Sequence, residues 1–201
     1  RTNLFKRLES SGQAFYLSVE RHILRNQVYL YAIENQLPLP IGTQDATFLD
    51  AIDYDLELAD SDDVEDEVEN ATADLTNAPH SLETWERRAQ AIYDSYDQTL
   101  NRRFKWLPSQ LLDKTTLASH LHADFTALLT VLQKTGPWSA AQDSKLQKLH
   151  DLLTVPHSQE KVLIFTQFSD TAEYLYQYLQ PRIPQLALIT GATDNSTELV
   201  Q

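Results

Sequence analysis

The chain has 201 residues, contains no Cys and no Met, and carries a formal net charge of −13. The lack of Cys excludes a disulfide framework and a thiolate metal site, and no apolar stretch is long enough to cross a membrane. We therefore expect a cytoplasmic protein with no membrane partner. Because the first residue is not Met, we also expect the chain to be part of a longer protein.

The negative charge is concentrated in one stretch. Between Asn26 and Glu86 there is no Lys or Arg, and there are 16 Asp or Glu. The remainder has 16 basic and 13 acidic residues, so the net charge does not exclude a nucleic-acid ligand. We interpret residues 37–80 as an acidic linker or insert. The alternative is a DNA-mimicking or autoinhibitory arm that competes for a basic groove.

The N-terminal segment, residues 1–36, is predicted to be dominated by one long helix. Apolar residues recur there at spacings of three, four and seven, which is the pattern of a helix with one buried stripe. Four cations fall mainly off the stripe: Lys6, Arg7, Arg21 and Arg25. They are either solvated or form a weak phosphate-contacting surface.

Residues 81–155 are predicted to form a helical region. Ser81 is a candidate N-cap for a helix whose apolar stripe runs from Leu82 to Phe104 at nearly heptad spacing. Three cations at its end (Arg102, Arg103 and Lys105) suit either the negative pole of the helix dipole or a phosphate. Two further helices are predicted, one over 117–132 and a shorter one over 143–153.

Residues 156–201 change in character. Val162–Phe165 and Leu186–Ile189 are continuous apolar runs of strand length, and an amphipathic helix lies between them. Such a crossover predicts two neighbouring parallel strands. The predicted fold class is therefore α/β, mostly helical, with a long-helix region followed by a βαβ unit.

Polar residues follow both predicted strands. We select Thr166, Gln167, Gly191 and Thr193 as candidate ligand-binding residues, because ligands of open α/β sheets bind beyond the carboxyl ends of the strands. Hydroxyls, an amide and a glycine suit hydrogen bonds to phosphate oxygens. Ordinary turn chemistry is the alternative. The sequence contains no phosphate-loop pattern and no recognisable catalytic or metal-ligand constellation.

Several segments resemble one protein family. Lys161–Ser169, with the sequence KVLIFTQFS, resembles motif IV of superfamily-two helicases in its Swi/Snf-related form. Asp143–Leu149 is similar to the segment that leads into the second RecA-like lobe there, and Leu188–Gly191 to the next strand of that lobe. Leu4–Phe15 is similar to a segment between the two motor lobes of bacterial Swi/Snf-like helicases.

The resemblance implies that residues 1–36 are an inter-lobe helix and that residues 156–201 start a truncated second RecA-like lobe. It implies a parent protein that hydrolyses ATP with Mg²⁺ and moves along DNA, its strand-end residues contacting the sugar–phosphate backbone. The phosphate loop and the arginine-finger motifs of such a motor are not in this sequence. We expect no ATP hydrolysis and no bound cofactor in the chain alone.

A second interpretation remains open. The heptad-like stripe and the acidic insert are also typical of a helical protein–protein interaction module with a structural α/β cap. The two interpretations predict different partners, namely DNA contacted through its backbone for the first and a protein for the second.

Overall fold

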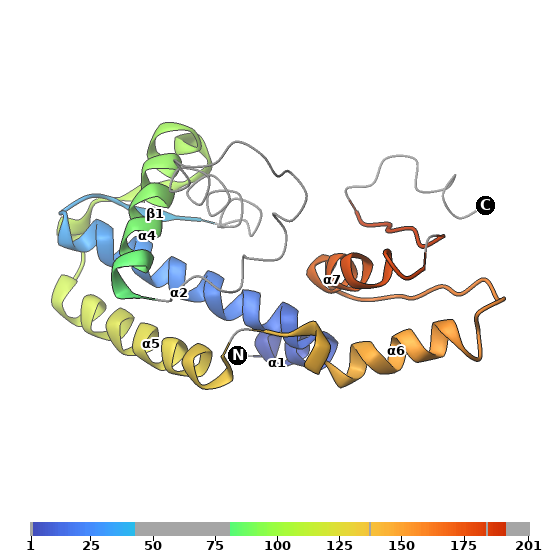
Figure 1. The fold of residues 1–201 in the computed structure, drawn as a ribbon. Coiled ribbons are helices and arrows are strands. Elements are labelled where there is room, and N and C mark those ends of the chain that lie inside the picture. Colours follow the sequence, from blue (N-terminus) through green and yellow to red (C-terminus); the bar gives the residue numbers. More distant parts are fainter. Residues whose placement is uncertain (1, 43–80, 137, 184, 192–201) are drawn as a thin grey trace, which may run out of the picture. The chain divides into compact units, whose positions relative to one another are not determined.

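The structure is a computed structural model that describes residues 2–42, 81–136, 138–183 and 185–191. The described chain is mostly helical and includes a small two-stranded antiparallel sheet (Figure 1). It divides into two compact units, Arg1–Ser18 with Trp138–Gln201 and Val19–Pro137. Most of the predicted acidic insert, residues 43–80, lies outside the described residues.

The first unit is built from helices that come from the two ends of the chain, together with the N-terminal part of α2. Its other elements are α1 (Thr2–Ser10), η3 (Ala140–Gln142), α6 (Ser144–Thr154) and α7 (Ser169–Leu179).

The second unit contains the remainder of α2 and the small sheet. The elements are α2 (Gly12–Glu34), β1 (Leu39–Ile41), α4 (Leu82–Gln98), η1 (Asn101–Arg103), β2 (Lys105–Leu107), η2 (Ser109–Leu111) and α5 (Lys114–Thr135).

The predicted single N-terminal helix is interrupted at Ser11. Ser11 Oγ accepts a hydrogen bond from the backbone N–H of Ala14 at 3.4 Å, so Ser11 acts as the N-cap of α2. Gly12 follows because a Cβ at this position would lie 2.0 Å from the Trp138 ring. The cap at Ser11 and the contact of Gly12 with the Trp138 ring therefore mark the boundary between two helices, where apolar periodicity alone predicted one.

The helices of the second unit bury the faces that periodicity predicted. Ser81 caps α4, since its side chain accepts a hydrogen bond from the backbone N–H of Thr84 at 3.3 Å. The buried residues of α4 are Trp85, Ala89, Ile92, Tyr93 and Tyr96. The helix ends at Gln98, however, so Phe104 and the three cations beside it lie outside it.

The antiparallel sheet was not predicted. Pro40 of β1 pairs with Trp106 of β2, and the Trp106 ring lies 5.8 Å from that of Tyr93 at 78°. Tyr93 also lies 5.5 Å from Tyr31 and donates a hydrogen bond to the Pro38 carbonyl at 2.8 Å. Such short strands are stabilised by the aromatic side chains that they bury, because a two-stranded ladder is marginal alone.

The predicted parallel strands at Val162–Phe165 and Leu186–Ile189 are not formed. Neither run belongs to a ladder in the described chain, and Phe165 and Leu163 are 89% and 60% exposed. A strand needs a neighbour for its backbone groups and a cover for its apolar face. The crossover helix between the two runs is confirmed as α7, but the strand pairing is a correction to the prediction.

Tyr93 gives the second unit a measurable pH dependence. Burial raises the pKa of Tyr93 to about 12 from its ordinary value of 10.0, and the charge of Asp97 adds to the rise. The folded state thus binds the phenolic proton more tightly than the unfolded chain. The stabilisation is complete below the ordinary pKa and is lost as the pH rises toward the folded pKa.

We expect this loss to reach about 1.4 kcal/mol of unfolding free energy near pH ~11. Urea denaturation followed by circular dichroism at pH ~9 and pH ~11 measures it. The Tyr93→Phe variant removes the titrating group and should lose less stability between the two pH values than the unmodified chain. An identical loss in both proteins would contradict this assignment.

Candidate nucleic-acid interface

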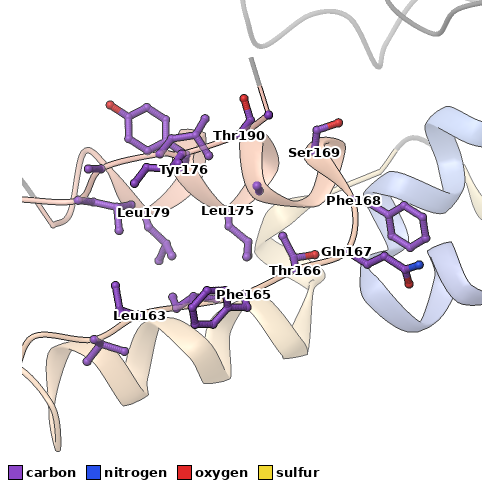
Figure 2. Close-up of a pocket in the computed structure, with 18 residues that line it drawn as sticks. Leu163, Phe165, Thr166, Gln167, Phe168, Ser169, Leu175, Tyr176, Leu179 and Thr190 are labelled. Atoms are coloured by element: carbon purple, nitrogen blue, oxygen red, sulfur yellow. The ribbon is translucent and has the colours of Figure 1, made fainter. Parts of the chain in front are cut away.

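Thr166 and Gln167 lie where the chain leaves the Val162–Phe165 run and approaches α7. Both are exposed, and Figure 2 shows them on the stretch just before Phe168. Thr166 Oγ1 lies 3.2 Å from Ser10 Oγ of α1. A hydroxyl and a side-chain amide are suited to hydrogen bonds with phosphate oxygens. Such contacts do not depend on the base sequence of the nucleic acid.

Arg7 of α1 is bound to the start of α7. Its guanidinium forms an ion pair with Asp170, and the two side chains are 25% and 13% exposed. The guanidinium carbon also lies 4.7 Å from the centroid of the Phe168 ring. Because a partly buried charge requires a partner, this arrangement favours a fixed position for the guanidinium. Arg7 therefore has an internal structural role, whether or not it contacts a phosphate as well.

The C-terminal end of α1 is held by two further contacts. Lys145 Nζ donates hydrogen bonds to the carbonyl oxygens of Glu9 and Ser10 at 2.5 and 3.0 Å. A cation at this position satisfies the free carbonyls of the last helical turn. Ser10 Oγ also lies 2.9 Å from Oγ1 of the buried Thr171. The end of α1 is thus attached to both α6 and α7.

A chain of hydrogen bonds joins α6 to α7. Asp143 caps α6 by accepting from the backbone N–H groups of Lys145 and Leu146 at 3.1 Å each, and it also accepts from the Tyr174 hydroxyl at 2.9 Å. Trp138 Nε1 donates to the same hydroxyl at 3.2 Å. Burial raises the pKa of Tyr174, and Asp143 adds to the rise although the Trp138 hydrogen bond opposes it. The neutral phenol therefore remains a donor to Asp143.

Two hollows adjoin Thr166 and Gln167. One, of about 920 Å³, lies between the 162–169 stretch, α7 and the 186–191 stretch. Figure 2 shows Leu175 and Leu179 of α7 among its lining residues, with Leu163 on one stretch and Thr190 on the other. The other, of about 720 Å³, is bordered by residues of α1, α6 and α7. Both have largely apolar walls, and both are lined by Thr166 and Gln167, the pair that we call the rim.

Gly191 borders the first hollow with Thr166 and Gln167. A Cβ built on Gly191 would meet no atom within 4 Å, so its backbone is open to close approach. Thr193, the fourth predicted strand-end residue, lies outside the described residues. The structure thus places three of the four strand-end candidates around one hollow, although no strand precedes them.

The four cations of the predicted basic surface differ in exposure and are divided between the two units. Lys6 is exposed and belongs with Arg7 to the first unit. Arg21 and Arg25 belong to the second unit, where Arg21 is only 7% exposed and Arg25 is half-buried. Both of these arginines have interaction partners within the protein. Burial leaves little of Arg21 open to a ligand, so Lys6 is the most accessible of the four cations.

Sequence reasoning did not select the residues that hold Arg7 and Thr166 in place. These are Ser10, Lys145, Phe168 and Asp170. Ser10, Lys145 and Phe168 lie inside segments that carry the resemblance, and Asp170 directly follows one of them. The ion pair joins residues 163 positions apart. No spacing rule within either segment indicates a contact at that separation.

Among the described residues there is no group of three or more His, Cys, Asp or Glu placed to hold a metal ion. No helix in the same part of the chain is long and apolar enough to cross a membrane. Comparison of the chain with protein-family models, curated proteins and solved structures gave no match.

The ion pair between Arg7 and Asp170 is expected to be energetically coupled. Residues in direct contact typically show coupling energies of about 0.5–3 kcal/mol, and partial burial should place this pair at about 1–2 kcal/mol. Urea denaturation of Arg7→Gln, Asp170→Asn and the double variant measures the coupling. The exposed hydrogen-bonded pair of His157 and Glu160 serves as a comparison, with an expected coupling below about 0.5 kcal/mol. Additive losses for Arg7 and Asp170 would argue against the contact.

Proposed function

We propose that this chain is part of an ATP-dependent DNA helicase or translocase. In this proposal it contributes inter-lobe helices and the motif IV part of a second RecA-like lobe. The supporting observation is that two of the segments of resemblance, Leu4–Phe15 and Lys161–Ser169, contact each other in the folded chain. Ser10 lies in one and Thr166 in the other, 156 positions apart, with their hydroxyl oxygens separated by 3.2 Å. Arg7 and Phe168 form a second contact between the same segments.

The chemistry of the rim is consistent with a backbone-contacting role. Thr166 and Gln167 present neutral hydrogen-bonding groups, and Gly191 on the same hollow permits close approach. Lys6 of α1 offers an exposed charge in the same unit. Neutral donors and acceptors fix the position of a nucleic acid through its phosphates, and cations supply most of the affinity. Such a set favours binding over acid–base catalysis.

ATP and Mg²⁺ belong to the parent protein in this proposal. Phosphoryl transfer requires a phosphate cradle, a metal ion and positive charge on the transferred group. The 201-residue sequence has no Gly-x4-Gly-Lys-Ser/Thr pattern to form the cradle. The role assigned to this chain is therefore to contact DNA and to connect motor parts.

A protein-binding module is the second candidate function. It is favoured by the exposed apolar stretch at Leu163 and Phe165, which is of a kind that marks interaction surfaces. Binding to a protein partner without any DNA binding would favour this candidate over the first.

DNA binding should depend on the rim. We expect a fluorescein-labelled DNA duplex to bind the chain with an affinity that falls steeply with salt. The double variant Thr166→Ala, Gln167→Ala should weaken binding by about 1–3 kcal/mol in total, because each neutral hydrogen bond contributes about 0.5–1.5 kcal/mol. Its salt dependence should stay unchanged, because neutral groups release no counterions. Fluorescence anisotropy over a salt series measures both quantities.

The matched control is Thr130→Ala with Gln133→Ala, which removes the same two side-chain types from exposed positions of α5. The control should bind DNA like the unmodified chain. Equal weakening by both double variants, or no binding by the unmodified chain, would argue against the proposed interface.

The chain alone is expected to release no phosphate from ATP, with or without DNA. A phosphate-release assay on the purified 201-residue chain in the presence of Mg²⁺ tests this expectation, with a no-protein reaction as the baseline. Release that DNA stimulates above the baseline would show that the sequence contains nucleotide-hydrolysing residues that the motif analysis missed.

A further inference from the structure

Three cations within four residues form an exposed basic turn in the second unit. We use the name basic turn for Arg102, Arg103 and Lys105, all of which are exposed. Their sequence position suggests cations that complement the dipole at the end of a helix. In the structure α4 ends at Gln98 with no basic residue in its last turn. The dipole effect falls off within the last turn, so it does not account for cations that lie beyond it.

The backbone that carries the basic turn is held by specific contacts. Trp106, next to Lys105, is in the ladder with β1 and donates a hydrogen bond from Nε1 to the Asn101 carbonyl at 2.9 Å. The Phe104 ring lies 4.4 Å from the ring of Tyr96. Alternate residues of an extended segment point to opposite sides. The aromatic residues at 104 and 106 therefore anchor the segment from one side and leave Lys105 on the other.

The described residues place few opposing charges at the basic turn. The nearest carboxylate identified by contact is Asp97, whose Oδ1 accepts a hydrogen bond from Asn101 Nδ2 at 3.2 Å. Arg103 has an interaction partner within the protein. In the described parts of the chain no ion pair involves Arg102 or Lys105. Among the described residues, two of the three cations thus have no opposing charge in contact.

We propose that the basic turn binds the phosphate backbone of a nucleic acid. Duplex DNA carries one negative charge per ~1.7 Å of its axis, so a short segment with three cations faces several phosphates. Phe104 and Trp106 are already engaged in ring contacts within the protein. The proposed contact is therefore between the cations and the charged phosphates of the nucleic acid, without stacking of its bases. This inference takes its partner from the proposed function, and it adds a contact region separate from the Thr166 and Gln167 rim.

The test is a salt series of DNA binding by the triple variant Arg102→Gln, Arg103→Gln, Lys105→Gln, measured by anisotropy with a fluorescein-labelled duplex. Each phosphate contact contributes about 0.9 to the slope of log affinity against log salt, so the slope should become shallower by about 2–3. The control is Arg87→Gln, Lys134→Gln, Arg182→Gln, which removes two Arg and one Lys from exposed positions elsewhere. Its slope should change by less than about 1.

An equal change of slope in both triple variants, or no change in either, overturns the inference. The rim variant Thr166→Ala, Gln167→Ala is measured in the same series to separate the two proposals. If only the rim variant weakens binding, the proposed function stands and the basic turn does not bind DNA. If the basic-turn variant changes the slope and the rim variant binds DNA as tightly as the unmodified chain, the basic turn is the contact and the rim assignment fails. Circular dichroism confirms that each variant keeps its helical content.

Discussion

The attachment of α1 to the start of α7 is the interaction on which the candidate interface depends. Arg7 is partly buried between Asp170 and the Phe168 ring, and Lys145 holds the last carbonyls of α1. Buried or half-buried charge is costly unless it is paired. Because each of these cations has a fixed partner, the N-terminal helix and the stretch before α7 are positioned together. Thr166 is placed beside Ser10 as a result.

The exposed apolar runs follow from a second constraint, which is the pairing of backbone groups. Val162–Phe165 and Leu186–Ile189 have the composition of strands that are buried on both faces. In the described chain no ladder includes them, and they border an open hollow instead. Apolar composition alone does not supply the hydrogen-bonding neighbour that a strand requires. The same exposed apolar surface is consistent with cover by further strands of a RecA-like lobe and with cover by a protein partner. The two candidate functions, helicase part and protein-binding module, correspond to these two kinds of cover.

The net charge of the chain does not show where its acidic and basic residues lie. The net charge of −13 comes from an acidic stretch, most of which lies outside the described residues. Within the described chain, cations have two kinds of role. Arg7, Arg21 and Lys145 are buried or contact other parts of the protein. Lys6 and the basic turn remain at the surface. Burial and partners, not the count of Lys and Arg, therefore decide which cations are open to a polyanion.

Local sequence patterns were enough to place the helices and several of their ends. The periodic stripe of α4, its cap at Ser81, the helix over 117–132, the short helix after Asp143 and the crossover helix α7 all follow from local patterns, because helical periodicity and capping act over a few residues. Contacts between distant parts of the chain set two other features: the break at Ser11, where a Cβ on Gly12 would meet the Trp138 ring, and the ladder between β1 and β2. The tertiary structure also decided that Arg21 is buried and that Arg7 pairs with Asp170. These features depend on contacts between residues far apart in the chain, and such contacts leave no periodic signal in a single sequence.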